Sequence, residues 1–135
     1  MRKIALILAA AAALATGPAL QARERLTPEQ RLDKLLAGRV AGKPTSCISS
    51  YDQRDMTVLN KTALVFGSGT TIYVNRPRNA QDLDDDDILV TRSYTSQLCR
   101  LDIVRTVERT GGFQTGFIAL EDFVPYRKVK VADAH

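Results

Sequence analysis

Two cysteines, Cys47 and Cys99, bracket most of the segments that have the residue pattern of β-strands, and the chain has no other cysteine. A disulfide between them would close a loop of about 53 residues and stabilise the folded state by about 4 kcal/mol, because it restricts the unfolded chain. A small domain is held folded by roughly 5–15 kcal/mol in all. Two buried free thiols are the alternative, and the compartment in which the chain folds decides between the two states.

The N-terminus indicates that compartment, because residues 1–22 have the pattern of a secretory signal peptide. Positive residues begin it, an apolar run occupies residues 4–15, and small residues precede a cleavage site after Ala22, with a cut after Ala15 as the alternative. The apolar run is shorter than the about 20 residues needed to cross a bilayer. We therefore expect a periplasmic or secreted protein of a Gram-negative envelope, with no transmembrane segment after cleavage and with the two cysteines paired.

The charge of the chain gives no indication of a nucleic-acid partner. Cleavage would remove two basic residues and no acidic one, so the formal charge of +4 for the whole chain falls to +2. The remaining lysines and arginines are scattered, without the stripe of basic and aromatic side chains that is typical of nucleic-acid binding. We therefore predict no nucleic-acid partner.

Residues 23–45 are expected to form one short α-helix followed by a linker. The helix begins at Thr27-Pro28-Glu29-Gln30, where the threonine suits the N-cap, the proline suits the first helical position and the glutamine completes a capping box. Gly38 is suited to end the helix. One helical face should dock on the rest of the fold through its leucines, which are Leu32, Leu35 and Leu36.

Residues 46–126 are expected to form a single, mainly antiparallel β domain, either a curled sheet or a small sandwich or barrel-like domain. Short alternating segments separated by turn residues predict about six or seven strands. One helix followed by a run of strands favours a helix packed against a sheet. Pro125 should confine its strand to an edge of the sheet. Residues 127–135 are expected to form a polar C-terminal tail.

Two β-hairpins carry a predicted register. The first turns at residues 67–69 and is expected to place Leu64 opposite Ile72, so that apolar side chains gather on one face. The second turns at a Gly-Gly pair and is expected to place Val104 opposite Ala119. In that register both faces of the second hairpin are largely apolar, which predicts that both are buried.

The residues that carry most enzyme chemistry are scarce. The chain has one histidine, His135, which is its last residue and therefore poorly placed to act as a general base. Paired cysteines would leave no thiol nucleophile, and the count of histidines and cysteines excludes a zinc site of the usual kind. We predict no catalytic residue and no cofactor, with Ca²⁺ as the one ion to consider.

An acidic run between two predicted strands is where Ca²⁺ could bind. Asp82, Asp84 and Asp86 have the spacing that opens an EF-hand loop, but Asp87 stands where that loop needs glycine and Ser93 where it needs a bidentate acid. A solvated acidic loop is therefore the favoured interpretation. A Ca²⁺ site at the first three of these residues is the alternative, and a hydrolase that uses Asp82 and Asp86 for acid–base work is less favoured.

The segment around this acidic run also contains residues that could bind a ligand or a partner. Residues 76–87 form a longer connection than a usual hairpin loop, and long polar loops often carry function. The candidate ligand or partner residues are Tyr73, Arg76, Arg78 and Arg92.

Three motifs together resemble a family of proteins. The motifs are Tyr73-Val74-Asn75-Arg76, the segment Ser96-Gln97-Leu98-Cys99-Arg100-Leu101-Asp102, and residues 116–126 with the sequence GFIALEDFVPY. They resemble a family of short exported proteobacterial proteins that is classed as a domain of unknown function, over about residues 47–126. The resemblance implies an envelope or periplasmic protein with two paired cysteines, and it implies no activity or ligand.

These observations together favour an exported envelope protein that acts as a non-enzymatic binding or interaction module. Its partner would be a small ligand or another envelope protein. A Ca²⁺-binding envelope protein and a hydrolase stay as the alternatives.

Overall fold

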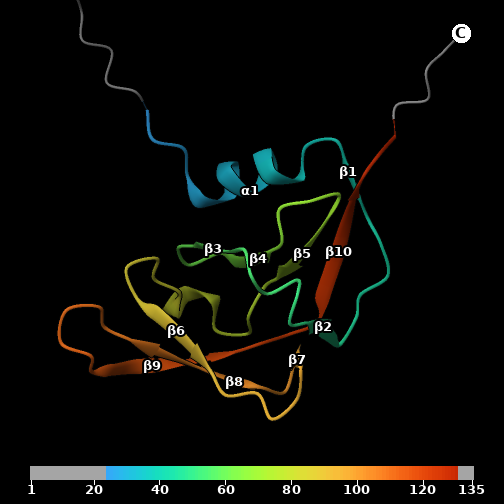
Figure 1. The fold of residues 1–135 in the computed structure, drawn as a ribbon. Helices are drawn as coiled ribbons and strands as arrows, with labels where there is room; N and C mark the ends of the chain where they lie inside the picture. Colours follow the sequence, from blue (N-terminus) through green and yellow to red (C-terminus); the bar gives the residue numbers. More distant parts are fainter. Residues whose placement is uncertain (1–23, 131–135) are drawn as a thin grey trace, which may run out of the picture.

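The structure is a computed structural model, and it describes residues 24–130 (Figure 1). The predicted signal peptide, residues 1–22, and residues 131–135 of the predicted tail lie outside the described residues. Within residues 24–130 the mainly β fold with one N-terminal α-helix is confirmed, with ten strands in antiparallel sheets that do not close into a barrel. No helix in this part of the chain is long and apolar enough to cross a membrane.

The strands form sheets of five, three and two strands. In spatial order the five-stranded sheet contains β1 (Arg39–Ala41), β10 (Phe123–Lys128), β5 (Thr71–Asn75), β4 (Ala63–Phe66) and β3 (Met56–Leu59). The three-stranded sheet contains β6 (Ile88–Thr91), β8 (Ile103–Val107) and β9 (Gln114–Ala119), and the two-stranded sheet contains β2 (Cys47–Ser49) and β7 (Gln97–Cys99). Helix α1 (Pro28–Leu36) precedes all of them, and a single 3₁₀ turn, η1 (Ala80–Asp82), follows β5.

These elements stack in layers, with the five-stranded sheet in the middle (Figure 1). On one side α1 covers the sheet, and Leu32 packs there against Val65 and other apolar residues of β3, β4 and β5. On the other side the three-stranded sheet covers it, and Phe66 packs there among buried residues such as Val104. The Phe66 ring also meets Phe123 edge-on, with ring centroids 5.7 Å apart. Both faces of the middle sheet are therefore buried.

The helix begins and ends where the sequence predicts. Thr27 accepts a hydrogen bond from the N–H of Gln30, and the Gln30 side chain accepts one from the N–H of Thr27, which completes the capping box. Gly38 follows the helix with a φ of 70°, a left-handed conformation that suits glycine. Leu32 and Leu36 pack toward the sheet as expected, whereas Leu35 is 38% exposed.

The β4–β5 hairpin differs in register from the prediction. Leu64 lies opposite Asn75 rather than Ile72, and Val65 lies opposite Val74. Leu64 therefore faces the three-stranded sheet, while Ile72 and Val74 face α1 together with Val65. The predicted face assignment of Leu64 was wrong, because the observed register differs by an odd number of residues and an odd shift exchanges the two faces.

The longer connection between β4 and β5 explains this difference. The N–H of Gly67 donates to the carbonyl of Asp55, which directly precedes β3. Gly67 therefore extends the pairing of β4 with β3 and does not close a tight turn with β5. The guanidinium of Arg39 donates to the carbonyls of Gly69 and Thr70, at 2.9 and 2.8 Å. Bonds to residues distant in the sequence thus set the length of this connection.

The β8–β9 hairpin is displaced by one residue from the predicted register. Ile103, not Val104, lies opposite Ala119, and Val104 lies opposite Ile118. A β-bulge follows Thr106, so the register changes between the turn and the body of the hairpin. Val104 and Ile118 are buried, while Ile103 is exposed. The prediction that both faces of this hairpin are buried was therefore wrong.

The expectation that Pro125 places its strand at an edge was also wrong. Strand β10 lies between β1 and β5. The carbonyl of Pro125 accepts a hydrogen bond from Gly42, so the main-chain polar atoms of Pro125 face the side on which β1 has already ended at Ala41. The proline therefore costs only the return bond to Gly42, just beyond the end of β1. Strand β1 lies within the predicted linker, and β10 continues to Lys128, into the predicted tail.

Candidate functional site

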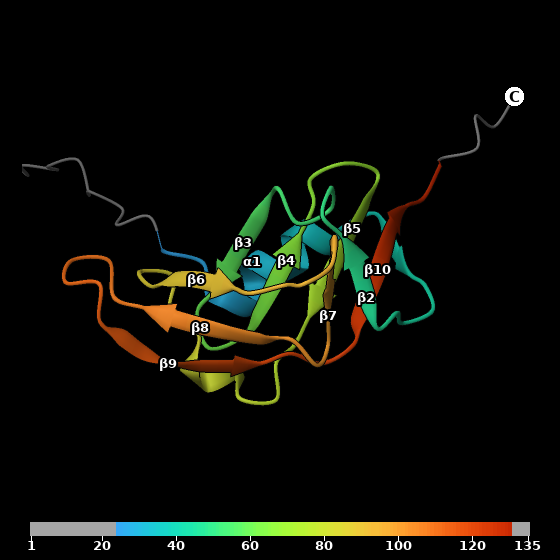
Figure 2. The same cartoon turned by 60° about the horizontal axis from the view of Figure 1, so that its bottom comes forward.

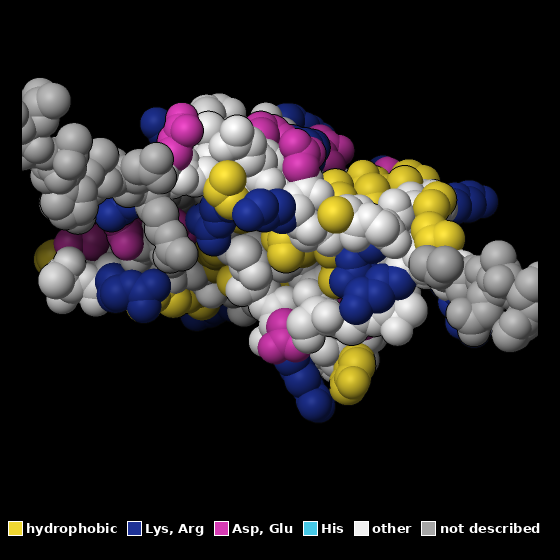
Figure 3. All heavy atoms as spheres, turned by 90° about the horizontal axis from the view of Figure 1, so that it is seen from above, with side chains coloured by type: hydrophobic (Ala, Val, Ile, Leu, Met, Phe, Trp, Pro, Cys, Tyr) yellow, Lys and Arg dark blue, Asp and Glu magenta, His cyan; other side chains and the backbone are white. Residues whose placement is uncertain are grey.

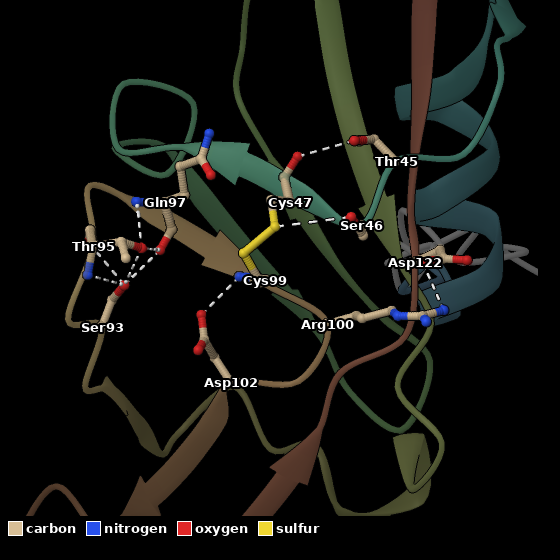
Figure 4. The surroundings of a disulfide bond; sticks show 10 residues. All are labelled: Thr45, Ser46, Cys47, Ser93, Thr95, Gln97, Cys99, Arg100, Asp102 and Asp122. Carbon is tan, nitrogen blue, oxygen red and sulfur yellow. Dashed lines mark hydrogen bonds and ion pairs between the residues drawn. A yellow bond between two sulfur atoms is a disulfide. The ribbon is translucent and has the colours of Figure 1, made fainter.

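The disulfide joins the two strands of the two-stranded sheet (Figure 4). Cys47 and Cys99 are directly opposite each other in the β2–β7 pair and form the predicted disulfide, with 4.0 Å between their Cα atoms. Asp102 accepts a hydrogen bond from the N–H of Cys99 at 2.7 Å and holds the turn that follows β7. Ile48 and Leu98, next to the cysteines, are buried in the core between the sheets. The disulfide therefore fixes β7 and the start of β8 to the rest of the fold.

The structure does not bring the four predicted ligand residues together, because each has its own surroundings. Tyr73 is half-buried and packs against the core between the two large sheets. Arg78 forms a salt bridge with Glu121, with 2.9 Å between Nε and Oε1. Arg92 is exposed beyond the end of β6.

Arg76, the fourth of these residues, joins the helix to the sheet. Its Nη1 and Nη2 atoms lie 3.0 and 3.3 Å from the two carboxylate oxygens of Glu29, which stands in the first turn of α1. The hydrogen bond from Arg76 lowers the pKa of Glu29, and the same bond raises the pKa of Arg76. This arginine therefore has a structural partner within the chain.

The acidic run forms a cluster that differs from the predicted one. The carboxylates of Asp84, Asp85 and Asp86 lie within 4.8 Å of one another and are all exposed. Asp82 instead accepts a hydrogen bond from the Asn79 side chain at 2.9 Å. Asp84 is partly occupied as well, because it accepts a hydrogen bond from the N–H of Asp86. With one ligand oxygen from each, these three exposed carboxylates supply fewer than the six to eight oxygens that Ca²⁺ prefers.

A hollow of about 500 Å³ lies beside the end of α1, and several of its polar side chains have partners within the chain. Arg39 donates to four main-chain carbonyls there or nearby. The Asp55 carboxylate accepts a hydrogen bond from the hydroxyl of Ser68 at 2.8 Å. The guanidinium of Arg54 lies 5.1 Å from the centre of the Tyr51 ring. The charged side chains of this hollow are thus engaged with groups of the same chain.

The outward side of the three-stranded sheet is different, because it is apolar and no other layer covers it (Figure 2). We call it the outer face. Cross-strand pairing identifies the side chains of the three strands that share this side. They are Ile88, Val90, Ile103, Arg105, Val107, Phe117 and Ala119. The opposite side of the same sheet carries Val104 and Ile118, which are buried against the middle sheet. The three-stranded sheet is thus apolar on both sides, but only its inner side is packed.

The most exposed apolar side chains of the outer face lie close to the β7–β8 turn. Ile103 is 63% exposed and Phe117 is 54% exposed, and Leu101, in the turn, is 85% exposed. These three residues and Ala119 line a groove of about 410 Å³ at this end of the outer face. A contiguous apolar surface of this kind is typical of a site of interaction.

Two salt bridges border this groove. Arg78 pairs with Glu121, and Arg100 pairs with Asp122 at 3.4 Å (Figure 4). Both pairs are largely exposed, so each contributes little to stability. The charges of Arg78 and Arg100 are therefore balanced at the groove, while Asp102, which also lines it, binds the N–H of Cys99.

The side of the molecule that carries α1 differs from the outer face in its distribution of charged side chains (Figure 3). Acidic and basic side chains are interspersed there, with apolar side chains exposed between them. Such a mixture is ordinary for a protein surface.

Sequence reasoning missed the outer face because it assigned the wrong register to β8 and β9. In the predicted register the outward residues of this hairpin belong to a second buried face, so Ile103 and Phe117 were not considered as binding residues. The alternation of Ile103, Arg105 and Val107 in β8 was the available signal, since a charged residue in the middle of a strand favours a solvent-facing side.

Comparisons of the chain with protein families, with curated proteins and with solved structures found no match. The function is therefore inferred from the geometry of the described residues and from the pattern of the sequence.

Proposed function

We propose that the protein is exported to the periplasm or the exterior of a Gram-negative cell and works there as a non-enzymatic interaction module. Two observations support export. Residues 1–22 have the pattern of a signal peptide, and Cys47 and Cys99 form a disulfide, which persists in oxidising compartments.

The apolar outer face is the single observation that carries the interaction role. Folding explains the apolar residues of the inner side, since they fill the core between the sheets. It does not explain why Ile103 and Phe117 are both exposed and line one groove together with Leu101 of the adjoining turn. Large apolar side chains gathered around a groove are what a partner buries when it docks.

Export can be tested directly. The full chain is expressed in a Gram-negative host, the periplasmic fraction is collected, and the mass of the protein is measured before and after alkylation under denaturing, non-reducing conditions. We expect cleavage after Ala22 and no alkylation until a reductant is added. A chain of full mass that stays in the cytoplasm, or two thiols that react without reduction, would contradict export.

Docking on the outer face can be tested by cross-linking in the native envelope. A photo-reactive phenylalanine analogue is placed at the position of Phe117, and in a control at the position of Tyr51, which is exposed on another part of the molecule. We expect an adduct from Phe117 that is lost when Ile103→Ser is added and is absent from the Tyr51 control. The same adducts from both positions, or none from Phe117, would reject the outer face as the docking surface.

A further inference from the structure

A single charged side chain, Arg105, stands in the middle of the outer face. Cross-strand pairing places Val90 on one side of it and Phe117 on the other, and Ile103 and Val107 lie two residues away along β8. Arg105 is exposed. A guanidinium surrounded by large apolar side chains at the centre of a surface is the composition found in the energetic centre of protein interfaces.

Arg105 also lacks the internal partner that neighbouring arginines have. Arg76, Arg78 and Arg100 each form a salt bridge with a carboxylate of the chain. Among residues 24–130, Arg105 forms neither a salt bridge nor a side-chain hydrogen bond, whereas Arg109 donates to the carbonyl of Asp86. The outer face therefore carries one uncompensated positive charge, at its centre.

We propose that the occupant of the outer face is an extended protein segment in which a carboxylate and a large apolar side chain are two residues apart, and that Arg105 binds the carboxylate. This inference rests on the docking function proposed above. An arginine cannot lose its charge when a partner covers it, so a purely apolar partner would bury an unpaired charge at a large cost. A carboxylate removes that cost and can bind the guanidinium through two parallel hydrogen bonds.

The spacing of the two recognition points follows from the strand. Ile103, on the floor of the groove, and Arg105 are two residues apart on the same side of β8. This corresponds to about 7 Å along a strand, and residues two apart in an extended partner segment have the same separation on one side. The carboxylate can therefore lie over Arg105 while the apolar side chain enters the groove.

Two other occupants fit the charge less well. A second copy of this chain that met the outer face across a central two-fold axis would place Arg105 against Arg105, and like charges oppose such contacts. An anionic membrane surface is usually recognised by clusters of about four to eight basic residues. The outer face offers one free guanidinium, because the arginines at the rim of the groove are already paired.

The test uses blocked, fluorescent seven-residue peptides with the mature, disulfide-bonded protein. In the first peptide a glutamate lies two residues from a leucine on one side and two residues from a phenylalanine on the other, and in two further peptides glutamine or lysine replaces the glutamate. Fluorescence anisotropy measures Kd for wild type, Arg105→Gln, Arg105→Glu and the control Arg127→Glu, which reverses an exposed charge on β10. Circular dichroism and melting confirm that each variant is folded.

We expect wild type and Arg127→Glu to bind the glutamate peptide about tenfold more tightly than the glutamine peptide, since hydrogen bonds between charged groups are about twice as strong as neutral ones. Arg105→Gln should lose this preference, and Arg105→Glu should prefer the lysine peptide. Equal affinity of wild type for all three peptides would overturn the carboxylate inference and leave the docking function standing. Loss of all peptide binding in Ile103→Ser, with no change of Kd in Arg105→Gln, would also overturn the carboxylate inference and leave the docking function standing.

The remaining outcomes identify other occupants. No binding of any peptide up to millimolar concentration overturns the inference, and the cross-linking experiment then decides separately on the docking function. Binding to phosphatidylglycerol vesicles that Arg105→Glu abolishes would establish a membrane surface instead. A concentration-dependent dimer in analytical ultracentrifugation that Ile103→Ser dissociates would establish a second copy of the chain.

Discussion

Asn75 is a fully buried polar residue whose side chain holds the connection between β9 and β10. Its exposed fraction is 0%. The side-chain amide donates to the carbonyl of Glu121 at 2.6 Å and accepts from the N–H of the same residue at 3.1 Å. Asn75 thus pairs with the Glu121 main chain as a neighbouring strand would. The Asn75→Ala variant would leave both main-chain groups without a partner inside the fold.

The expected loss follows from these two bonds. A hydrogen bond contributes about 0.5–1.5 kcal/mol, and leaving a buried donor or acceptor unpaired adds its desolvation cost of about 1–3 kcal/mol. Partial access of water to Glu121, which lies near the surface, reduces the second contribution. We therefore expect Asn75→Ala to lower the free energy of unfolding by about 3 kcal/mol, which lowers Tm by on the order of 10–15 °C in a domain of this size.

The Asn75→Asp variant adds a pH dependence with a definite sign. An ionised aspartate at this position can still accept from the Glu121 N–H, but its second oxygen would face the Glu121 carbonyl. Burial and this carbonyl should raise the pKa of the introduced carboxyl in the folded state above its unfolded value of about 3.9. The variant is then close to wild type below about pH 4. It loses stability relative to wild type as the pH rises from the unfolded pKa to the folded pKa, by up to about 1.4 kcal/mol per pH unit.

Urea unfolding followed by circular dichroism measures both effects, with wild type compared at each pH. The matched control is Glu121→Gln, which changes the side chain that pairs with Arg78 and leaves the main chain that Asn75 binds. We expect that control to stay within about 0.5 kcal/mol of wild type. The reasoning is refuted if Asn75→Ala costs less than about 1 kcal/mol, or if Asn75→Asp is as far below wild type at pH 4 as at pH 7.

Three further predictions concern the disulfide, the helix and the acidic cluster. Cys47→Ser combined with Cys99→Ser should lower the free energy of unfolding by about 4 kcal/mol in urea titrations, because the unfolded chain regains the freedom of a long loop; a loss below about 1 kcal/mol would contradict this. The lowered pKa of Glu29 means that its contribution to stability is present above the unfolded pKa and is lost as the pH falls through the folded pKa. Wild type should therefore melt above Glu29→Gln at pH 7 and together with it at about pH 3, and a difference that persists at low pH would argue against the salt bridge as its cause. CaCl₂ and NaCl at equal ionic strength should shift Tm equally in wild type and in Asp84→Asn with Asp86→Asn, and a larger shift with CaCl₂ in wild type alone would establish a Ca²⁺ site.

The parts of the fold that could be predicted depend on residues close together in the sequence. The start of α1 is determined by the capping box of Thr27 and Gln30, and its end by Gly38, so four to ten residues contain all the information needed. The disulfide was predictable for another reason, since two cysteines in a chain with the pattern of an exported protein leave one possible pairing.

The registers could not be predicted, because contacts distant in the sequence set them. The connection after β4 takes its length from the bond between Gly67 and Asp55 and from the contacts of Arg39. The bulge in the β8–β9 hairpin accompanies Thr115, whose hydroxyl bonds to both Thr106 and Asp87. The local sequence pattern does not reveal the bonds that set the connection after β4 or those that accompany the bulge. A difference of one residue then decided whether Ile103 was assigned to the core or to the surface.

The four candidate ligand residues do not lie together in the structure, for a related reason. Tyr73 and Arg76 are three residues apart across the end of β5, so they lie in different surroundings, and Arg76 reaches Glu29 of the helix instead of a pocket. Sequence proximity places side chains together only within a regular element of known register. The role proposed for Arg105 could not be predicted from the sequence, because it depends on which strands lie beside β8.

The segment beside β9 determines how a partner can approach the outer face. The side chain of Asn79 donates to the carbonyl of Phe117 and accepts from the N–H of Ala119, and the N–H of Arg78 donates to the carbonyl of Ala119. This segment therefore fills the hydrogen-bonding edge of β9 next to the groove, where an added strand would otherwise pair. A partner at this end of the sheet must be recognised through side chains rather than through its main chain. Selectivity then depends on the fit of an apolar group in the groove and on the charge that Arg105 presents.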